Sequence, residues 1–430
     1  MILAPRAAGL VHASTFMLRM RRSVLILGLL AGTLGGARSS SAQYTGNFQT
    51  NIISGVVSNW AGDYLIGSNT VADALLIQNG GALSNRNGYV GYEIGADNNT
   101  VLISDSNSLW SVDGGLVIGN KGNGNQLVVT NGASVVCSNG IIGVAGNSNM
   151  VLIADGAWWT LSGNLTIGPG GSGNQLVLAN GGFVLVMNLA HTATLDVQSG
   201  ALTLNGGVAT LDGLTATNGI RSGVTFSGGY LASGATQISN TQPMVIGDGA
   251  STATFQLNGG THTFVGGLSV LSNAVVTGCG TINGNVTIYP GGIVAASCGG
   301  ELTFTGIVTN NGDLQVVEGT TLETYGTLVN NGILELFDAG PTNFHGVFIN
   351  NGTIRDGANI VISGKDVILK VVAVPLLTYS LQVTPSLTPA TWVNTGASQS
   401  SFNFAPRLLT FTDTGGATNR PSRFYRFELH

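Results

Sequence analysis

Asn-Asn-Gly recurs at a fixed step of 20 residues in this sequence, at Asn310–Gly312, Asn330–Gly332 and Asn350–Gly352. Other positions keep the same step: Gly306, Gly326 and Gly346, and also Leu314 and Leu334. A constant period of this length is the signature of a repeat architecture, in which each unit stacks on its neighbours. The repeat therefore limits the fold more strongly than any other feature of the chain.

A second period fills the first half of the chain. Apolar runs ending in Asn-Gly, Asp-Gly or Asp-Ser alternate with short segments of the type Ile-Gly. The glycines of these short segments are Gly67, Gly95, Gly119, Gly143 and Gly168, with steps of 24 to 28 residues. One unit is thus about 24 residues long, and the pattern predicts two short strands and two turns in each unit.

Gly accounts for 66 of the 430 residues, whereas only 8% of the residues are charged. This composition favours turn-rich β structure and disfavours long helices. Alternation in "GDLQVVEG" and "GILELFDAG" places Leu314 and Leu334 inside and Gln315 and Glu335 outside. We predict an all-β parallel β-helix (a β-solenoid with coils of about 20–25 residues) over residues 43–372. The side chains of Asn310, Asn330 and Asn350 are expected to form a ladder, amide on amide, along one corner.

The N-terminus resembles a secretory signal peptide. "MLRMRR" is basic, "SVLILGLLAGTLGG" is apolar, and "SSAQ" supplies small residues for cleavage after Ala42. We predict a signal peptide over residues 1–42, with Met1, Met17 and Met20 as alternative starts. The apolar run is shorter than the roughly 20 residues that span a bilayer. An exported protein that is not integral to the membrane is therefore expected, located in the extracellular space, at the cell surface or in the periplasm.

After removal of residues 1–42 the chain holds ten basic and 20 acidic residues, a formal net charge of −10. Between Gly122 and Ile354 the only basic residue is Arg221. Nucleic-acid binding needs a basic stripe that neutralises phosphates, so this partner class is excluded. The partners that remain are extracellular polysaccharides and cell-surface components.

The amino-acid composition of the chain changes near residue 372. Prolines become frequent, at Pro375, Pro385, Pro389, Pro406 and Pro421, and arginines gather in the same tail. We predict a domain boundary here, followed by a small C-terminal β-sandwich-like module over residues 373–430.

Two resemblances follow from these segments. "GCGTINGNVTIYPGGIVAASCGGELTFTGIVTNNGDLQV" resembles the Gly/Asn-rich β-solenoid repeats of autotransporter-passenger-type proteins, and the likeness covers most of residues 60–360. The tail is similar to a short C-terminal β module found on secreted bacterial repeat proteins, which implies a role in sorting or surface attachment. The residues that carry this second likeness are Tyr379, Leu381, Trp392, Phe411, Thr412, Asp413, Arg423, Phe424, Tyr425 and Arg426.

A carbohydrate-active enzyme is the main rival interpretation. Glycosidases use two carboxylates about 5 to 9.5 Å apart. Glu318 and Asp338 occupy the same repeat position, so they are expected about one strand spacing, roughly 4.8 Å, apart. They are the weak catalytic candidates, within an acidic patch that also contains Asp313, Glu323 and Glu335. Two readings of the pair stay open beside catalysis: solvated turn residues and a Ca²⁺ site. No other cofactor is expected.

Tryptophans, cysteines and histidines are three further groups of candidate residues. Trp110, Trp158 and Trp159 lie two coils apart at one stack position, where they would form a sugar-stacking stripe if exposed or fill the core if buried. Cys279 and Cys298 are 19 residues apart, so neighbouring coils would bring them together as a disulfide; three buried thiols, with Cys137, are the alternative. His191, His262 and His345 are isolated, and no metal site is predicted.

The sequence therefore predicts a non-catalytic, exported structural or adhesive surface protein. The alternative is a carbohydrate-binding or polysaccharide-cleaving β-helix protein.

Overall fold

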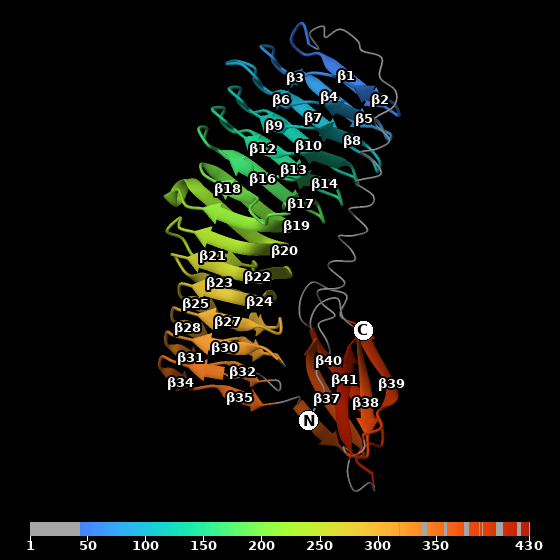
Figure 1. The fold of residues 1–430 in the computed structure, drawn as a ribbon, viewed down its shortest axis with the longest axis vertical. Helices are drawn as coiled ribbons and strands as arrows, with labels where there is room; N and C mark the ends of the chain where they lie inside the picture. The colour runs from blue at the N-terminus through green and yellow to red at the C-terminus, as the bar shows by residue number, and fades with distance from the viewer. Residues whose placement is uncertain are drawn as a thin grey trace.

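The computed structural model describes residues 44–317, 319–336, 342–356, 359–373, 378–386, 388, 390–400, 407–418 and 423–429. Its first part is a parallel β-solenoid whose coils stack from β1 to β35 (Figure 1). The predicted all-β class and parallel β-helix are confirmed. Each coil contributes three short strands instead of the two expected, so the stack has three parallel sheets, named here faces A, B and C. The run after each Asn-Gly or Asp-Gly turn is the strand that the sequence reading did not count.

Face A begins each coil. Its short strands are β1 (Thr50–Ser54), β4 (Ala74–Gln78), β7 (Thr100–Ile103), β10 (Gln126–Val129), β13 (Met150–Ile153), β16 (Asn174–Ala179), β21 (Met244–Ile246), β23 (Leu268–Val270), β25 (Val286–Ile288), β28 (Val308–Asn310), β31 (Leu328–Asn330) and β34 (Phe348–Asn350).

Face B follows on the chain. Its short strands are β2 (Val57–Asn59), β5 (Ala82–Asn85), β8 (Leu109–Val112), β11 (Ser134–Cys137), β14 (Trp158–Leu161), β17 (Phe183–Val186), β26 (Ile293–Ala296), β29 (Asp313–Val316), β32 (Ile333–Leu336) and β35 (Thr353–Asp356). Figure 1 shows β5, β8, β14 and β17 along the inner edge of the curved stack.

Face C closes each coil. Its short strands are β3 (Tyr64–Ile66), β6 (Gly88–Val90), β9 (Gly115–Ile118), β12 (Asn139–Ile142), β15 (Leu165–Ile167), β18 (Thr194–Val197), β27 (Glu301–Phe304), β30 (Thr321–Thr324) and β33 (Thr342–Phe344).

Long strands replace the short ones in the middle of the stack, where the sequence pattern blurs. β19 (Gly200–Ala216) and β20 (Ser222–Ile238) pair continuously around all three faces, with the 3₁₀ turn η1 (Gly219–Arg221) between them. β22 (Ala253–Phe264) and β24 (Ala274–Asn283) span faces B and C. At the corners of this region the backbone stays paired with the neighbouring strand. The turn residues that mark the other coils are therefore less regular here.

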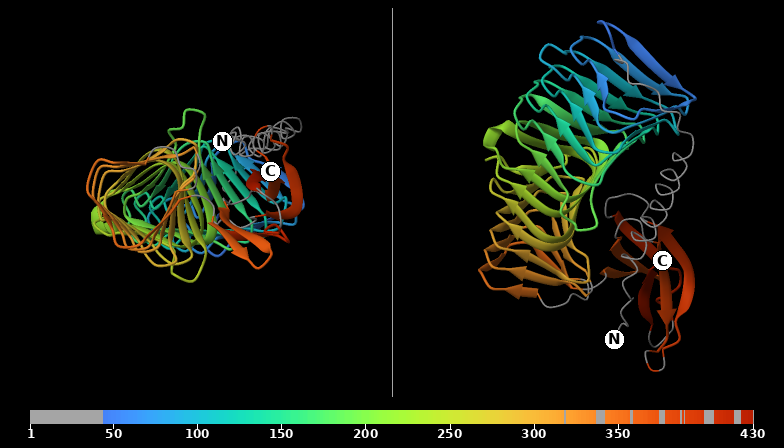
Figure 2. Two further views of the ribbon diagram at one scale, coloured as in Figure 1. Left: turned by 90° about the horizontal axis from the view of Figure 1, so that it is seen from below. Right: turned by 45° about the horizontal axis from the view of Figure 1, so that its top comes forward.

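Strand register gives the length of each coil. Gln126 pairs with Thr100 and Met150, and Asn330 pairs with Asn310 and Asn350. The coil therefore shortens toward the C-terminal end, from 24–26 residues to 20, as the two sequence periods predict. Inward side chains of successive coils meet in one continuous apolar core. The view along the stack in Figure 2 shows the closed cross-section that this core fills.

A buried asparagine ladder runs along the corner before face A. The Oδ1 atom of Asn125 accepts hydrogen bonds from the backbone N–H of Asn99 (2.8 Å) and from its Nδ2 (2.9 Å). Asn149 does the same for Asn125, and Asn174 for Asn149. All four side chains are fully buried. The ladder satisfies one backbone N–H in each coil that no strand pairing reaches.

Glycine is needed beside this ladder. Gly119 has φ of +78°, and a Cβ atom there would lie 2.0 Å from the side-chain amide of Asn149. Any larger residue would be strained and would also displace the ladder. Gly67 and Gly143 lie equally close to ladder residues, and in the second coil Gly91, not the Gly95 of the sequence pattern, holds this place.

The C-terminal part consists of two three-stranded antiparallel sheets. One contains β36 (Asn359–Ser363), β37 (Asp366–Ala373) and β40 (Arg407–Asp413), and the other β38 (Thr378–Thr384), β39 (Val393–Ser400) and β41 (Phe424–Leu429). Side chains from both sheets share a small core of Val367, Leu369, Tyr379, Leu381, Leu409 and Phe411.

The change from parallel to antiparallel pairing comes earlier than the predicted boundary at residue 372. Parallel pairing ends in β35, at Asp356, whereas β36 and β37 form an antiparallel hairpin whose turn contains Gly364. Residue 372 therefore lies inside β37. Apolar alternation in "NIVISGKDVILKVV" is the same in a solenoid coil and in a hairpin, so the periodicity alone did not separate them.

We predict that Asn125→Ala lowers the stability of the solenoid by about 3 kcal/mol, because it leaves buried donors of Asn99 without an acceptor. The midpoint of urea unfolding measures the change. Asn123→Ala is the matched control: Asn123 accepts equivalent bonds from Asn147, but at an exposed corner where water replaces them. Equal midpoints for the two variants would contradict the role given to the buried ladder.

Candidate functional site

The predicted acidic patch is divided between two faces of the solenoid. Asp313 and Glu335 lie on face B, in β29 and β32, whereas Glu323 lies on face C, in β30. The catalytic candidates Glu318 and Asp338 fall outside the described residues, so their separation, their role and the Ca²⁺ alternative stay predictions. The geometry of the patch is therefore built from the three acids that the structure places.

On face B the two carboxylates share one amide. Gln315 Nε2 donates to Asp313 Oδ2 at 2.7 Å and lies 3.3 Å from Glu335 Oε2. Arg355, one coil further on, forms an ion pair with Glu335 at 2.9 Å. Gln315 and Glu335 are buried although they point away from the core. Stacking at one strand spacing covers each side chain with its neighbours.

Asp313 is the perturbed acid of this group. Burial, and then the charge of Glu335, raise the pKa of its carboxyl from 3.8 to about 7. Its Oδ1 atom is buried without a hydrogen-bond partner in the described part of the chain. A protonated carboxyl fits this environment better than an ionised one, because an unpartnered buried charge is costly.

Glu323 is held differently. Asn343 Nδ2 donates to its Oε1 at 2.5 Å, and His345 Nε2 contacts its Oε2 at 2.7 Å. Hydrogen bonds from Asn343 and then from His345 lower the pKa of Glu323. The ring of Tyr325 stacks on that of His345 with centroids 4.5 Å apart. Glu323 is thus an ionised acceptor fixed by the next coil.

These contacts limit what the patch can do chemically. Glu335 is engaged by Arg355, Glu323 by Asn343 and His345, and Asp313 has one oxygen buried. Within the described ranges, no three residues of the His, Cys, Asp or Glu type are arranged to hold a metal ion. Glu323 and Glu335 therefore act as contacts between coils, whereas Asp313 is bound by Gln315 of its own strand.

The raised pKa of Asp313 predicts a stability that falls as pH rises. The unfolded chain ionises this group near its ordinary value of 3.8, whereas the folded chain keeps the proton up to about 7. Folding is consequently penalised progressively between about pH 4 and pH 7, and the penalty stays at higher pH. Asp313→Asn should remove this part of the decline, as measured by urea midpoints at pH 5 and pH 8.

Glu323→Gln is the control of opposite sign. The pKa of Glu323 is lowered in the folded protein. Its carboxylate therefore stabilises the folded state at pH values above the ordinary pKa of a glutamate, and this stabilisation is lost as the pH falls. This variant should lose stability at pH 8 more than at acid pH. A pH decline in Asp313→Asn that matches the unmodified protein would overturn the account of Asp313.

The three tryptophans are placed on opposite sides of face B. Trp110 and Trp159 point inward and are fully buried. Trp110 Nε1 donates to Asn85 Oδ1 at 2.6 Å, and Trp159 Nε1 to the Sγ atom of the free, buried Cys137 at 3.3 Å. Trp158 points outward and is half-buried, with its ring 4.3 Å from that of Phe183 in the next coil. Of the three, only Trp158 can meet a ligand.

The predicted asparagine column and cysteine pair are both brought together. Asn310 Nδ2 donates to Asn330 Oδ1 at 2.7 Å, and Asn330 Nδ2 to Asn350 Oδ1 at 2.6 Å. Cys279 and Cys298 form a disulfide between neighbouring coils, with Cα atoms 5.8 Å apart. The ladder of Asn99, Asn125, Asn149 and Asn174 was not identified from the sequence. Its signal was present, since each of these residues directly precedes or begins a face A strand.

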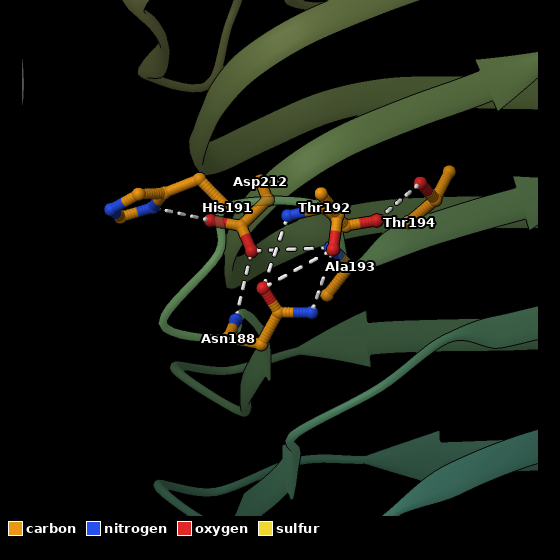
Figure 3. Close-up of polar contacts among 6 residues, drawn as sticks. All are labelled: Asn188, His191, Thr192, Ala193, Thr194 and Asp212. Carbon is orange, nitrogen blue, oxygen red and sulfur yellow. Dashed lines mark hydrogen bonds and ion pairs between the residues drawn. The ribbon is translucent and has the colours of Figure 1, made fainter.

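A loop stapled at its base interrupts the otherwise short corners between faces B and C (Figure 3). It connects β17 to β18 and includes Asn188, His191 and Ala193. Asp212, from the next coil, accepts hydrogen bonds from the backbone N–H of Asn188 (2.8 Å) and of Ala193 (3.3 Å), and its Oδ1 lies 3.1 Å from His191 Nδ1. The sequence showed only a blurred repeat here, so this loop was missed.

The base of the loop is fixed while its tip is open. The Asn188 side chain bonds to the backbone N–H and the hydroxyl of Thr192. Leu189 is 81% exposed, and the side chain of His191 is 75% exposed, whereas that of Asp212 is only 2% exposed. A buried carboxylate thus orders a loop whose apolar and imidazole groups face solvent.

Asp212→Ala is expected to release this loop, because two backbone N–H groups lose their acceptor. Limited proteolysis should then cut within residues 187–193 several-fold faster, while the rest of the solenoid resists. His191→Ala removes only the exposed contact and should leave the cleavage rate near that of the unmodified protein. Equal rates for all three proteins would exclude Asp212 as the staple.

In the C-terminal sheets, Asp413 is the centre of a small cluster of tail residues. Arg423 forms an ion pair with Asp413 at 2.7 Å, and the Tyr425 hydroxyl donates to it at 2.8 Å. The guanidinium of Arg426 lies 4.5 Å from the centre of the Trp392 ring. The contacts of Asp413 join β40 to β41 across the two sheets, whereas Arg426 of β41 and Trp392, next to β39, belong to one sheet, so these tail residues have structural roles.

Comparisons with known proteins identify no family for the chain. No protein-family model matches it, and no curated protein matches it. Among solved structures, the TibC-catalysed hyper-glycosylated fragment of TibA aligns with 72% of this chain and 96% of its own length, at 15% sequence identity and a TM-score of 0.27. Similarity at this level carries no argument about function.

No helix in the part of the chain that the structure describes is both long enough and apolar enough to cross a membrane.

Proposed function

We propose that the chain is exported and works as a non-catalytic structural or adhesive rod, outside the cell or at its surface. The observation that carries this proposal is the use of its polar side chains. The Asn125 ladder, the Asn330 ladder, Glu323 and Glu335 all bond from one coil to the next. Side chains that hydrogen-bond between coils in this way stiffen the rod and are not available for catalysis.

The signal-like N-terminus supports export, and the disulfide between Cys279 and Cys298 fits an oxidising compartment. The excess of acidic residues after residue 42 agrees with a partner other than nucleic acid. The two C-terminal sheets form a second unit with a core of its own, which we propose as the element for attachment or sorting.

Polysaccharide cleavage is the weaker candidate. A glycosidase needs one carboxyl as acid and a second as base or nucleophile, both open to the sugar. Asp313 has the raised pKa of an acid, but Glu335 beside it is bound to Arg355. No depolymerisation is therefore expected when the purified protein is incubated with neutral and acidic polysaccharides. Release of reducing ends that disappears in Glu318→Gln would reverse this assignment.

Export is tested by producing the full-length protein in a Gram-negative bacterium. We expect a mature N-terminus at Gln43, detected by mass spectrometry, and access of an added protease or antibody to the protein on intact cells. Leu27→Arg interrupts the apolar signal segment and is the matched control, which should remain uncleaved inside the cell. An unprocessed protein in the cytoplasm, with the same distribution as this control, would refute the proposal.

A further inference from the structure

Face B carries a long uncharged surface. From β5 to β26 the strand segments on face B, residues 208–211 of β19 included, contain no Asp, Glu, Lys or Arg, and Asp113, Asp155 and Asp212 lie at the corners that flank them. Charged side chains appear on this face only from Asp313 onward. The chain is otherwise acidic, so a surface that extends over this many coils without charge suits a neutral ligand better than an ionic one.

The only outward pair of adjacent large aromatic rings on this uncharged stretch is Trp158 with Phe183. They pair in register between β14 and β17, and their rings are tilted by 43°. Ser134 is the register partner of Trp158 on the other side, and its small side chain leaves the indole without a second ring against it. Thr160 adds a hydroxyl on the same outward face. Aromatic surface beside hydroxyl groups is a combination suited to sugars, which present both C–H faces and O–H groups.

The stapled loop begins at the strand that carries Phe183. It leaves β17 after Val186 and places the exposed Leu189 and His191 at the edge of face B. Because Asp212 holds the base of the loop, the tip is presented in an ordered position. The aromatic pair lies at the start of these face B strands and the loop follows their end, so the loop lies across the width of face B from the pair.

We propose that Trp158 and Phe183, on the uncharged stretch of face B, bind a neutral polysaccharide whose chain runs along the stack. This inference deepens the adhesive function proposed above and rests on it. Successive coils are about 4.8 Å apart, close to the length that one sugar contributes to an extended chain, so each coil meets one sugar. An extended peptide is less suited, because β14 is hydrogen-bonded to both neighbours and offers no free strand edge.

Binding is tested with the purified full-length secreted protein and soluble β-glucan, galactomannan and dextran, by affinity electrophoresis and calorimetry. At least one of these neutral polymers should retard the protein, and Trp158→Ala should weaken that binding roughly tenfold, which is about 1.4 kcal/mol. Phe183→Ala should act in the same direction. Trp158→Phe keeps an aromatic ring and should restore most of the affinity.

Leu152→Ala is the matched control, since Leu152 is half-buried and points outward from face A of the same coil as Trp158. It should leave binding unchanged, and circular dichroism should show that every variant is folded. Three results would overturn the proposal: no retardation by any neutral polymer, unchanged affinity in folded Trp158→Ala, or binding only to alginate, an anionic polymer. If one of these results is obtained while the protein is found at the cell surface, only the sugar-binding proposal is refuted and the adhesive rod remains supported. If export fails while sugar binding is intact, only the proposed location of the rod is refuted.

Discussion

Hydrogen bonding between identical positions of neighbouring coils is the interaction on which the rest of the structure depends. Each coil is too short to bury an apolar face of its own, so core, strands and corners are all completed by the coils beside it. The ladder through Asn125 shows this most clearly, because a single side chain satisfies the backbone and the side chain of the preceding coil. Such a ladder also fixes the register of three sheets at once.

Much of the fold could be predicted from the sequence, because the coils of a solenoid repeat in the chain at a regular interval. Gly119 and its equivalents gave the coil length, and Asn330 with its repeats gave one corner. The sequence analysis predicted too few strands per coil. Two strands of three or four residues that are separated by one short corner look like a single run in the sequence. The antiparallel pairing of β36 and β37 was not predicted, because the alternation of these strands is the same as that of a coil.

The candidate site was harder to predict, for a physical reason. Trp158 and Trp159 are neighbours in sequence, yet one faces solvent and the other the core, because adjacent residues of a strand point to opposite sides. Only the register of neighbouring coils shows that Phe183 continues the outward column. Likewise, the partner of His191 is Asp212, 21 residues away. Contacts between residues of different coils can be predicted only when the register of the stacked coils is known.

The disulfide between Cys279 and Cys298 has a consequence for how the rod comes apart. A solenoid loses coils from its ends, since a terminal coil has one neighbour and an internal coil has two. The disulfide joins adjacent coils between the short-period and long-period segments. Under mechanical tension applied at the C-terminal end, the 20-residue coils peel away until the force reaches Cys298, and the covalent link then passes the force directly to Cys279, so that the chain between the two cysteines cannot be extended.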